Sequence, residues 1–357
     1  MPFRSIVGHH HVVDLLTRAV ARDSLPPSMI LSGPDGVGKH TVAVALAQLL
    51  NCTKKKSSDL RPGVDACGTC AACRRIQRGS YPDVIQVGIE GDAAVIKVEQ
   101  VRAVLEVVGF RPYEGRRRVV IIDPADALER FGQNALLKVL EETPPATIFV
   151  LVTARPDALY ATIRSRCPQI RFGALTVAEI AEVLTRERGL AERDARAAAI
   201  VAGGSVTRAL EAASEQSTDA RSQALSVLRA AAAIREPPPS PGGTAAGYGE
   251  ARRRLMETMK AILGIEKRQA SAAAEREQVT LSLLALSSLL RDVTMIGARG
   301  AACDLANVDL KAELEQVAGS FGRARVMRAF AAVDRAISAL SSNANPKVVV
   351  DWLAFQM

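Results

Sequence analysis

The stretch Met29-Ile-Leu-Ser-Gly-Pro-Asp-Gly-Val-Gly-Lys-His40 decides the expected fold of this chain. A short apolar run ends at Ser32, a glycine-rich segment follows, and residues 41–50 are mostly apolar and are expected to form a helix. Strand, glycine-rich loop and helix in this order are typical of a P-loop, whose backbone N–H groups surround a phosphate chain at the start of a helix. The candidate nucleotide-binding residues here are Gly33, Gly36, Gly38 and Lys39.

The segments on either side of this stretch predict the domain order. Apolar runs at 84–87, 119–122 and 148–153 alternate with helical patterns at 98–108 and 133–142, and a helix is expected over 6–21. This alternation predicts an α/β domain with a mostly parallel sheet over residues 1–172. We expect three short helices over 173–215, and then an all-helical region over 216–357 that a Pro/Gly-rich insertion interrupts at 236–249.

Length and charge exclude few functions. The 357 residues, 48% of them hydrophobic, are enough for two or three packed domains, and the net charge of +8 favours acidic partners such as nucleic acid. The opening residues lack the apolar core of a signal peptide, and apolar runs such as 281–290 are shorter than the ~20 residues of a membrane span. We therefore expect a cytoplasmic protein without a membrane span, whose cysteines are thiols or metal ligands.

The residues that would support nucleotide hydrolysis are altered. A P-loop ATPase has Ser or Thr after the lysine to hold Mg²⁺, whereas here His40 follows, and Thr41 comes one place later, rotated by about 100° around the helix. Asp123 ends the predicted strand 119–122, as a Mg²⁺-supporting aspartate would, or it is an ordinary strand-end residue. Pro124 stands where a related ATPase has a glutamate to orient water. Mg²⁺ binding is therefore doubtful, and independent ATP hydrolysis is not expected.

Four cysteines are spaced as the ligands of a closed metal site. They form a C-x14-C-x2-C-x2-C pattern, and four thiolates are the donor set of structural Zn²⁺. The alternative is four unrelated thiols; Cys167 and Cys303 are isolated and expected to be ordinary buried residues. The predicted zinc ligands are Cys52, Cys67, Cys70 and Cys73.

Basic residues beside the predicted strand 119–122 have two interpretations. Arg111, Arg116, Arg117 and Arg118 either face DNA phosphates or lie in a solvated loop. The low aromatic content of 4% does not suggest a platform for base stacking.

Taken together, several motifs resemble the clamp-loader subunits of bacterial DNA polymerase III, and the resemblance covers nearly the whole chain. The motifs are residues 6–9 (IVGH), the P-loop, the cysteine segment followed by Tyr81-Pro-Asp83, the strand ending at Asp123, Asn134–Pro145 (NALLKVLEETPP), Ser165-Arg-Cys167 and Asn343-Ala-Asn-Pro346. Within the family the chain is more similar to delta prime subunits than to the ATP-hydrolysing gamma/tau subunits, because His40 and Pro124 depart from the ATPase pattern.

The resemblance implies an AAA+ module, built from the α/β P-loop domain and a helical lid, followed by a helical collar that joins subunits in a hetero-oligomeric ring. It implies gamma/tau and delta subunits, the sliding clamp and primed DNA as partners during replication. Arg166 would act in trans as an arginine finger on the neighbouring subunit's nucleotide. Thr153 and Arg208 would lie near the sensor 1 and sensor 2 positions, and ATP or ADP could still occupy the P-loop.

Two other functions stay open on the sequence. One is a gamma/tau-like subunit with active ATPase, in which Thr41 or water completes the metal shell. The other is a zinc-dependent nucleic-acid binder that uses the lysines 54–56 of the cysteine loop, which are otherwise a solvated charge run. Polymerase activity is not expected of this chain, since no carboxylate pair of a two-metal site is identifiable; a polymerase label would belong to the assembly.

Overall fold

The computed structural model describes residues 2–54, 65–91, 93, 95–213, 216–233, 245–262, 272–298, 305–341 and 344–357. It divides into two compact units: unit 1 is Met1–Val183 with Gly204–Thr207, and unit 2 is Leu184–Gly203 with Arg208–Met357. The predicted three domains, with their boundaries after residues 172 and 215, stay a prediction. Of the Pro/Gly-rich insertion expected at 236–249, residues 236–244 lie outside the described part of the chain. Residues 245–249 form the start of helix α11.

Unit 1 contains a five-stranded parallel sheet in the order β2-β3-β4-β1-β5. The strands are β1 (Ser28–Ser32), β2 (Val84–Val87), β3 (Arg118–Ile122), β4 (Thr147–Thr153) and β5 (Gln169–Arg171). The three central strands β3, β4 and β1 are buried along their whole length, which is why the sequence reads there as continuous apolar runs. The predicted α/β class is confirmed, whereas the edge strand β5 was missed because its three residues include two polar ones.

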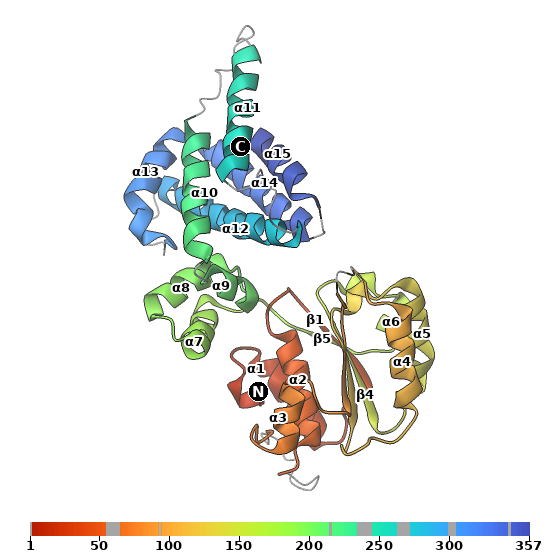
Figure 1. Cartoon of the computed structure of the whole chain (residues 1–357). Helices are drawn as coiled ribbons and strands as arrows, with labels where there is room; N and C mark the ends of the chain where they lie inside the picture. Colours follow the sequence, from red (N-terminus) through yellow and green to blue (C-terminus); the bar gives the residue numbers. More distant parts are fainter. Residues whose placement is uncertain are drawn as a thin grey trace. The chain divides into compact units, whose positions relative to one another are not determined.

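Helices cover both faces of this sheet (Figure 1). One face carries α1 (His10–Ala21), α2 (Lys39–Asn51) and α3 (Ala71–Gln77), and the other carries α4 (Val98–Val108), α5 (Arg130–Glu141) and α6 (Ala161–Arg164). Successive strand residues alternate between the two cores: Met29 and Leu31 pack against the first group of helices and Ile30 against the second. The result is a three-layer domain whose loops are gathered at the two ends of the strands.

The carboxyl ends of β1, β3 and β4 meet at one edge of the sheet. The glycine-rich segment follows β1, Asp123 follows β3, and Thr153 ends β4 in register with Ser32. Ligands of open parallel sheets bind outside the carboxyl ends of the strands. This edge is therefore the place to examine for a nucleotide site.

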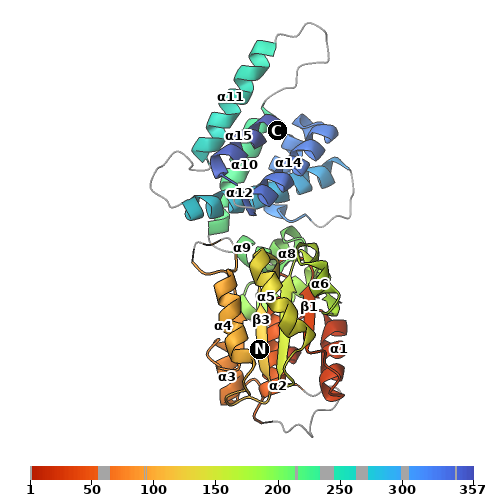
Figure 2. The same cartoon turned by 90° about the vertical axis from the view of Figure 1, so that its right-hand side faces the viewer.

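Unit 2 is all-helical and is built around α12 (Ala272–Gly297), which contacts α10, α13 and α14 (Figure 2). By length and composition Glu275–Gly297 could cross a membrane, but half of this stretch is buried and its Leu283, Leu286 and Leu290 belong to the core of unit 2. A core helix therefore explains its apolar composition. The remaining helices of the chain are α7 (Val177–Arg188) and α9 (Val206–Ala212), which cross the unit boundaries, and α8 (Glu192–Val201), α10 (Gln216–Ala232), α11 (Ala245–Ile262), α13 (Lys311–Ser320), α14 (Arg323–Ser341) and α15 (Pro346–Gln356).

Candidate nucleotide site, cysteine cluster and arginine

The glycine-rich segment forms a tight loop that only glycines allow. Gly36 and Gly38 have φ angles of 73° and 99°, in the left-handed region, and Gly38 is the N-cap of α2. The backbone N–H of Val206 donates to the carbonyl of Gly36 at 2.8 Å, and a Cβ at residue 36 would lie 2.2 Å from Ser205 Oγ. Residues 204–207 thus lie directly against the loop and require glycine at position 36.

Lys39 is folded back onto this loop. Its side chain is 6% exposed, and Nζ donates to the carbonyl oxygens of Gly33 and Pro34, each at 2.6 Å. Burial lowers the pKa of the Lys39 ammonium, while the carboxylates of Asp35, Asp123 and Asp126 oppose that shift. Within the described residues, the backbone N–H groups of 36–41 donate to no protein acceptor, so the start of α2 presents a row of unsatisfied donors beside a buried cation.

His40 is paired with Asp123. Its Nδ1 lies 2.9 Å from Asp123 Oδ2, and because a carboxylate only accepts hydrogen bonds, Nδ1 is the donor. The residue that replaces the expected hydroxyl therefore binds the carboxylate that would support Mg²⁺.

Asp126, the other carboxylate near this edge, is fully engaged. Thr153 Oγ1 donates to its Oδ1 at 2.8 Å, and Arg155 Nε and Nη2 contact its Oδ2, each at 2.9 Å. The Asp126 side chain is also buried, so it does not supply the general base that Pro124 removes. Sequence reasoning missed the role of Arg155, for which no local motif exists.

Arg166 lies at the opposite end of the strands from the P-loop. It precedes β5, and its carbonyl accepts a hydrogen bond from Ser28 Oγ at 3.4 Å, at the first residue of β1. Its guanidinium donates to Thr162 O at 2.9 Å and forms an ion pair with Glu141, at the end of α5. Both charged groups of this pair are at least one-third exposed.

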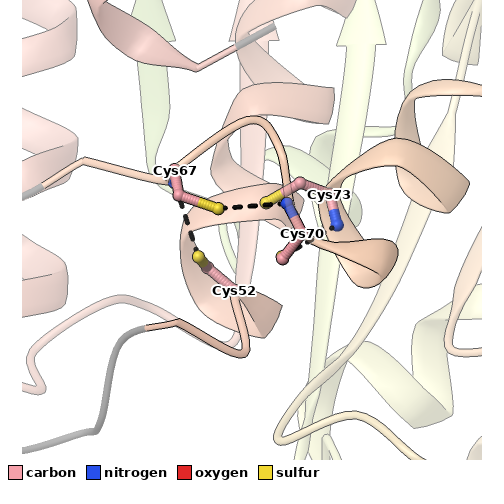
Figure 3. Close-up of side chains that lie close together, drawn as sticks. All are labelled: Cys52, Cys67, Cys70 and Cys73. Atoms are coloured by element: carbon pink, nitrogen blue, oxygen red, sulfur yellow. Dashed lines mark hydrogen bonds between the residues drawn. The ribbon is translucent and has the colours of Figure 1, made fainter.

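The four cysteines predicted as metal ligands converge (Figure 3). Their Sγ atoms all lie within 4.8 Å of one another, and tetrahedral Zn²⁺ with bonds of about 2.3 Å places sulfurs about 3.8 Å apart. Cys52 follows α2, Cys70 caps the start of α3 and Cys73 lies within α3. The geometry and the all-thiol donor set are those of a closed structural zinc site.

Backbone N–H groups stabilise negative charge on three of the four sulfurs, whereas burial raises the pKa of the Cys73 thiol. The N–H of Cys67 donates to Cys52 Sγ at 3.4 Å, that of Cys70 to Cys67 Sγ at 3.3 Å and that of Cys73 to Cys70 Sγ at 3.4 Å. Although burial opposes it, donors from Thr53 and Cys73 lower the pKa of Cys70 to about 5. A thiolate is the form that binds metal.

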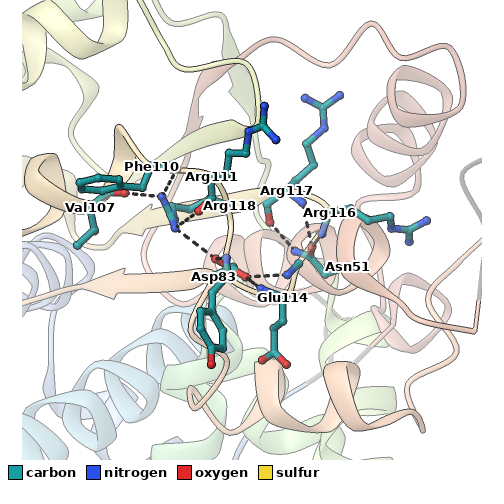
Figure 4. A network of polar contacts seen from close by, with 11 residues as sticks. Asn51, Asp83, Val107, Phe110, Arg111, Glu114, Arg116, Arg117 and Arg118 are labelled. Atoms are coloured by element: carbon teal, nitrogen blue, oxygen red, sulfur yellow. Dashed lines mark hydrogen bonds and ion pairs between the residues drawn. The ribbon is translucent and has the colours of Figure 1, made fainter.

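Arg118, the last of the basic residues beside β3, lies in an internal network (Figure 4). Arg118 is buried, donates to the carbonyls of Val107, Phe110 and Arg111, and pairs with buried Asp83 at 3.4 Å. Both interpretations, DNA phosphates and a solvated loop, are therefore wrong for Arg118, because its side chain is buried. Arg116 donates to Cys52 O and Arg117 pairs with Asp23, while Arg111 is exposed.

Comparison with known proteins relates this chain to subunits of DNA polymerase III. Residues 8–176 match the family described as DNA polymerase III, delta subunit. These residues resemble the clamp-loader subunits of DNA polymerase III. The chain is 37% identical over 191 residues to DNA polymerase III subunit tau/gamma of Haemophilus influenzae, and 36% identical over 140 residues to subunit delta' of Pseudomonas aeruginosa.

These matches cover only part of each protein. The first spans 52% of this chain and 26% of the tau/gamma subunit, and the second spans 39% of this chain and 41% of the delta' subunit. A gamma-subunit-related protein of Thermotoga maritima is 18% identical over 96% of this chain and 97% of its own, with a TM-score of 0.45. The chain is similar to tau/gamma and delta' subunits alike.

The structure brings together some of the predicted site residues and not others. Gly33, Gly36, Gly38, Lys39 and Asp123 lie at one edge of the sheet in unit 1, and Thr41 is in the first turn of α2. Arg208 belongs to unit 2, so its sensor 2 role stays a prediction.

Proposed function

We propose that this chain is a delta prime-like subunit of the DNA polymerase III clamp loader, which helps to load the sliding clamp onto primed DNA in the cytoplasm. It assembles with gamma/tau and delta subunits in a ring, hydrolyses no ATP itself, and donates Arg166 to the nucleotide of a neighbour. The observation that carries this proposal is that the carboxylates at the chain's own P-loop site are already hydrogen-bonded. His40 donates to Asp123, and Thr153 and Arg155 donate to Asp126.

The position of Arg166 supports action in trans. The five residues of β1 span four steps of about 3.3 Å, so about 13 Å separate the P-loop from the end of the sheet where Arg166 lies, and Arg166 does not serve the site of its own chain. This position supports the proposal that Arg166 acts on a nucleotide bound to another subunit.

The ion pair with Glu141 orients the Arg166 side chain and is weak enough for another anion to replace it. Exposed ion pairs contribute only about 0–1 kcal/mol, so a phosphate group with more than one negative charge can displace Glu141. A bound γ-phosphate would thus exchange one acceptor of the guanidinium for a stronger one.

Structural Zn²⁺, held by Cys52, Cys67, Cys70 and Cys73, is part of the proposal. When bound, it supplies a crosslink between the end of α2 and the start of α3. The site is closed, because four thiolates leave no position for substrate, and it has no catalytic role.

The proposal is tested in the reconstituted clamp loader with Arg166→Ala. We expect the ring to assemble and ATP hydrolysis at the interface that Arg166 faces to fall by about 10³-fold or more. The matched control is Arg164→Ala, because Arg164 lies in the same segment and pairs only with exposed Asp157 among the contacts seen in the described chain. Equal ATPase rates for wild type and Arg166→Ala would exclude the trans-acting role.

A further inference from the structure

The position that Mg²⁺ would occupy in the P-loop site does not suit that ion. Mg²⁺ requires oxygen ligands in octahedral geometry, and P-loop proteins provide a hydroxyl after the lysine and a strand-end carboxylate. Here the residue after Lys39 provides an imidazole, and that imidazole donates its Nδ1–H to Asp123 at 2.9 Å. The hydroxyl is therefore missing, and the carboxylate is already hydrogen-bonded.

The phosphate-binding half of the same site is intact. The backbone N–H groups of residues 36–41 find no acceptor within the described residues, and a helix N-terminus with free N–H groups attracts anions. Independently, the Lys39 ammonium is buried in the loop, where it donates to the carbonyls of Gly33 and Pro34 and lies 4.0 Å from the exposed carboxylate of Asp35. A buried cation and a row of free donors point to a polyanionic ligand.

We propose that this P-loop binds the phosphate chain of a nucleoside diphosphate or triphosphate without a divalent cation, and that the His40 ring occupies the metal position beside Asp123. On binding, Lys39 exchanges loop carbonyls for phosphate oxygens. His40 keeps donating a hydrogen bond to the Asp123 carboxylate. This donor, in place of a metal ion, stabilises the negative charge of Asp123 near the phosphates. The inference deepens the proposed function, and it rests on that proposal for the choice of a nucleotide.

Calorimetric titration of the full chain with ADP, in excess Mg²⁺ and in excess EDTA, tests this inference. We expect the two dissociation constants to agree within about threefold, which corresponds to less than about 0.7 kcal/mol. Lys39→Ala should abolish the binding in both buffers. Binding that requires Mg²⁺ would overturn the inference, and so would the absence of ADP binding in either buffer.

A variant that restores the hydroxyl after Lys39 tests whether His40 is the reason that ADP binding does not require Mg²⁺. In His40→Thr a hydroxyl follows Lys39 and Asp123 is released, so Mg²⁺ should strengthen ADP binding by about tenfold or more. The His40 side chain is 45% exposed, so its replacement leaves the core intact. His11→Thr, the same change at an exposed position of α1, is the matched control and should keep the wild-type ratio.

This test is independent of the proposed role in the ring. Arg166-dependent ATPase of the assembly needs no nucleotide in this chain, so it would survive a failure of the ADP titration. Conversely, Mg²⁺-independent ADP binding could be observed in a chain whose Arg166 contributes nothing to its neighbour.

Discussion

Replacing Asp83 with asparagine tests whether the basic residues next to β3 serve the fold. Asp83 lies just before β2, and its carboxylate is completely buried. Oδ1 accepts from the N–H of Tyr113 at 2.7 Å and from Arg118 Nη2 at 3.4 Å, and Oδ2 accepts from the N–H groups of Glu114 and Gly115 at 2.8 and 2.7 Å (Figure 4).

The size of the effect follows from these contacts. An asparagine of the same shape keeps one acceptor oxygen, so its NH₂ group faces two donors, and the Arg118 guanidinium loses its counter-charge. Breaking one partner out of a buried ion pair costs about 3–5 kcal/mol. For a unit of this size, that loss lowers the melting temperature by about 6–20 °C.

Urea denaturation of wild type, Asp83→Asn and Asp157→Asn measures this difference. Asp157 is 89% exposed in its ion pair with Arg164, so its substitution should change the free energy of unfolding by less than about 0.5 kcal/mol. If Asp83→Asn lowers the free energy of unfolding by less than about 1 kcal/mol, the claim that Asp83 and Arg118 stabilise residues 111–115 is refuted.

The same carboxylate gives the stability a defined pH dependence. Burial opposes ionisation of Asp83, but the N–H groups of Glu114, Gly115 and Tyr113 and the charge of Arg118 outweigh it and lower its pKa in the folded state. A group with a lowered folded pKa contributes its stabilisation above the unfolded value of about 3.9 and loses it as the pH falls through the folded value. The difference in the free energy of unfolding between wild type and Asp83→Asn should therefore be constant above about pH 5 and become smaller below about pH 4.

Three further outcomes are expected. Purified protein should contain about one equivalent of zinc, and Cys70→Ser should lower this zinc content. Cys167→Ser, which changes a buried thiol outside the cluster, should not lower it. Full zinc content in Cys70→Ser would contradict the site. Gly36→Ala should destabilise unit 1 by about 1–3 kcal/mol, because of its φ of 73° and the Cβ placed 2.2 Å from Ser205 Oγ, and an unchanged melting temperature would show that residues 204–207 do not lie on the loop in solution. Lys54→Ala should leave DNA binding of the assembly unchanged, and a marked loss would support the nucleic-acid-binding role of the cysteine loop.

Patterns with a strong periodicity predicted their elements well. The helix expected over 98–108 is α4, and the apolar runs at 84–87 and 119–122 lie in β2 and β3. In β3, burial on both sides of a parallel sheet leaves little choice of residue. The convergence of the cysteines was also predictable, since their spacing already matched a known ligand pattern.

Side-chain partners distant in sequence could not be predicted. His40 and Asp123 are 83 residues apart, and Arg166 and Glu141 are 25 apart, so no local spacing indicates either pair. Arg118 looked like surface charge because it stands in a run of three arginines, yet it is the first residue of a buried strand and its charge is offset by Asp83. The fold brings these charges together, and only then does their chemistry become visible.

ATP turnover by the purified chain, alone and then mixed with gamma/tau and delta subunits, tests the central claim most directly. The account predicts no measurable hydrolysis by the chain alone, and hydrolysis in the mixture that depends on Arg166 of this chain. Steady turnover by the chain alone, abolished by Lys39→Ala, would contradict it and would make this protein an active ATPase of the gamma/tau kind.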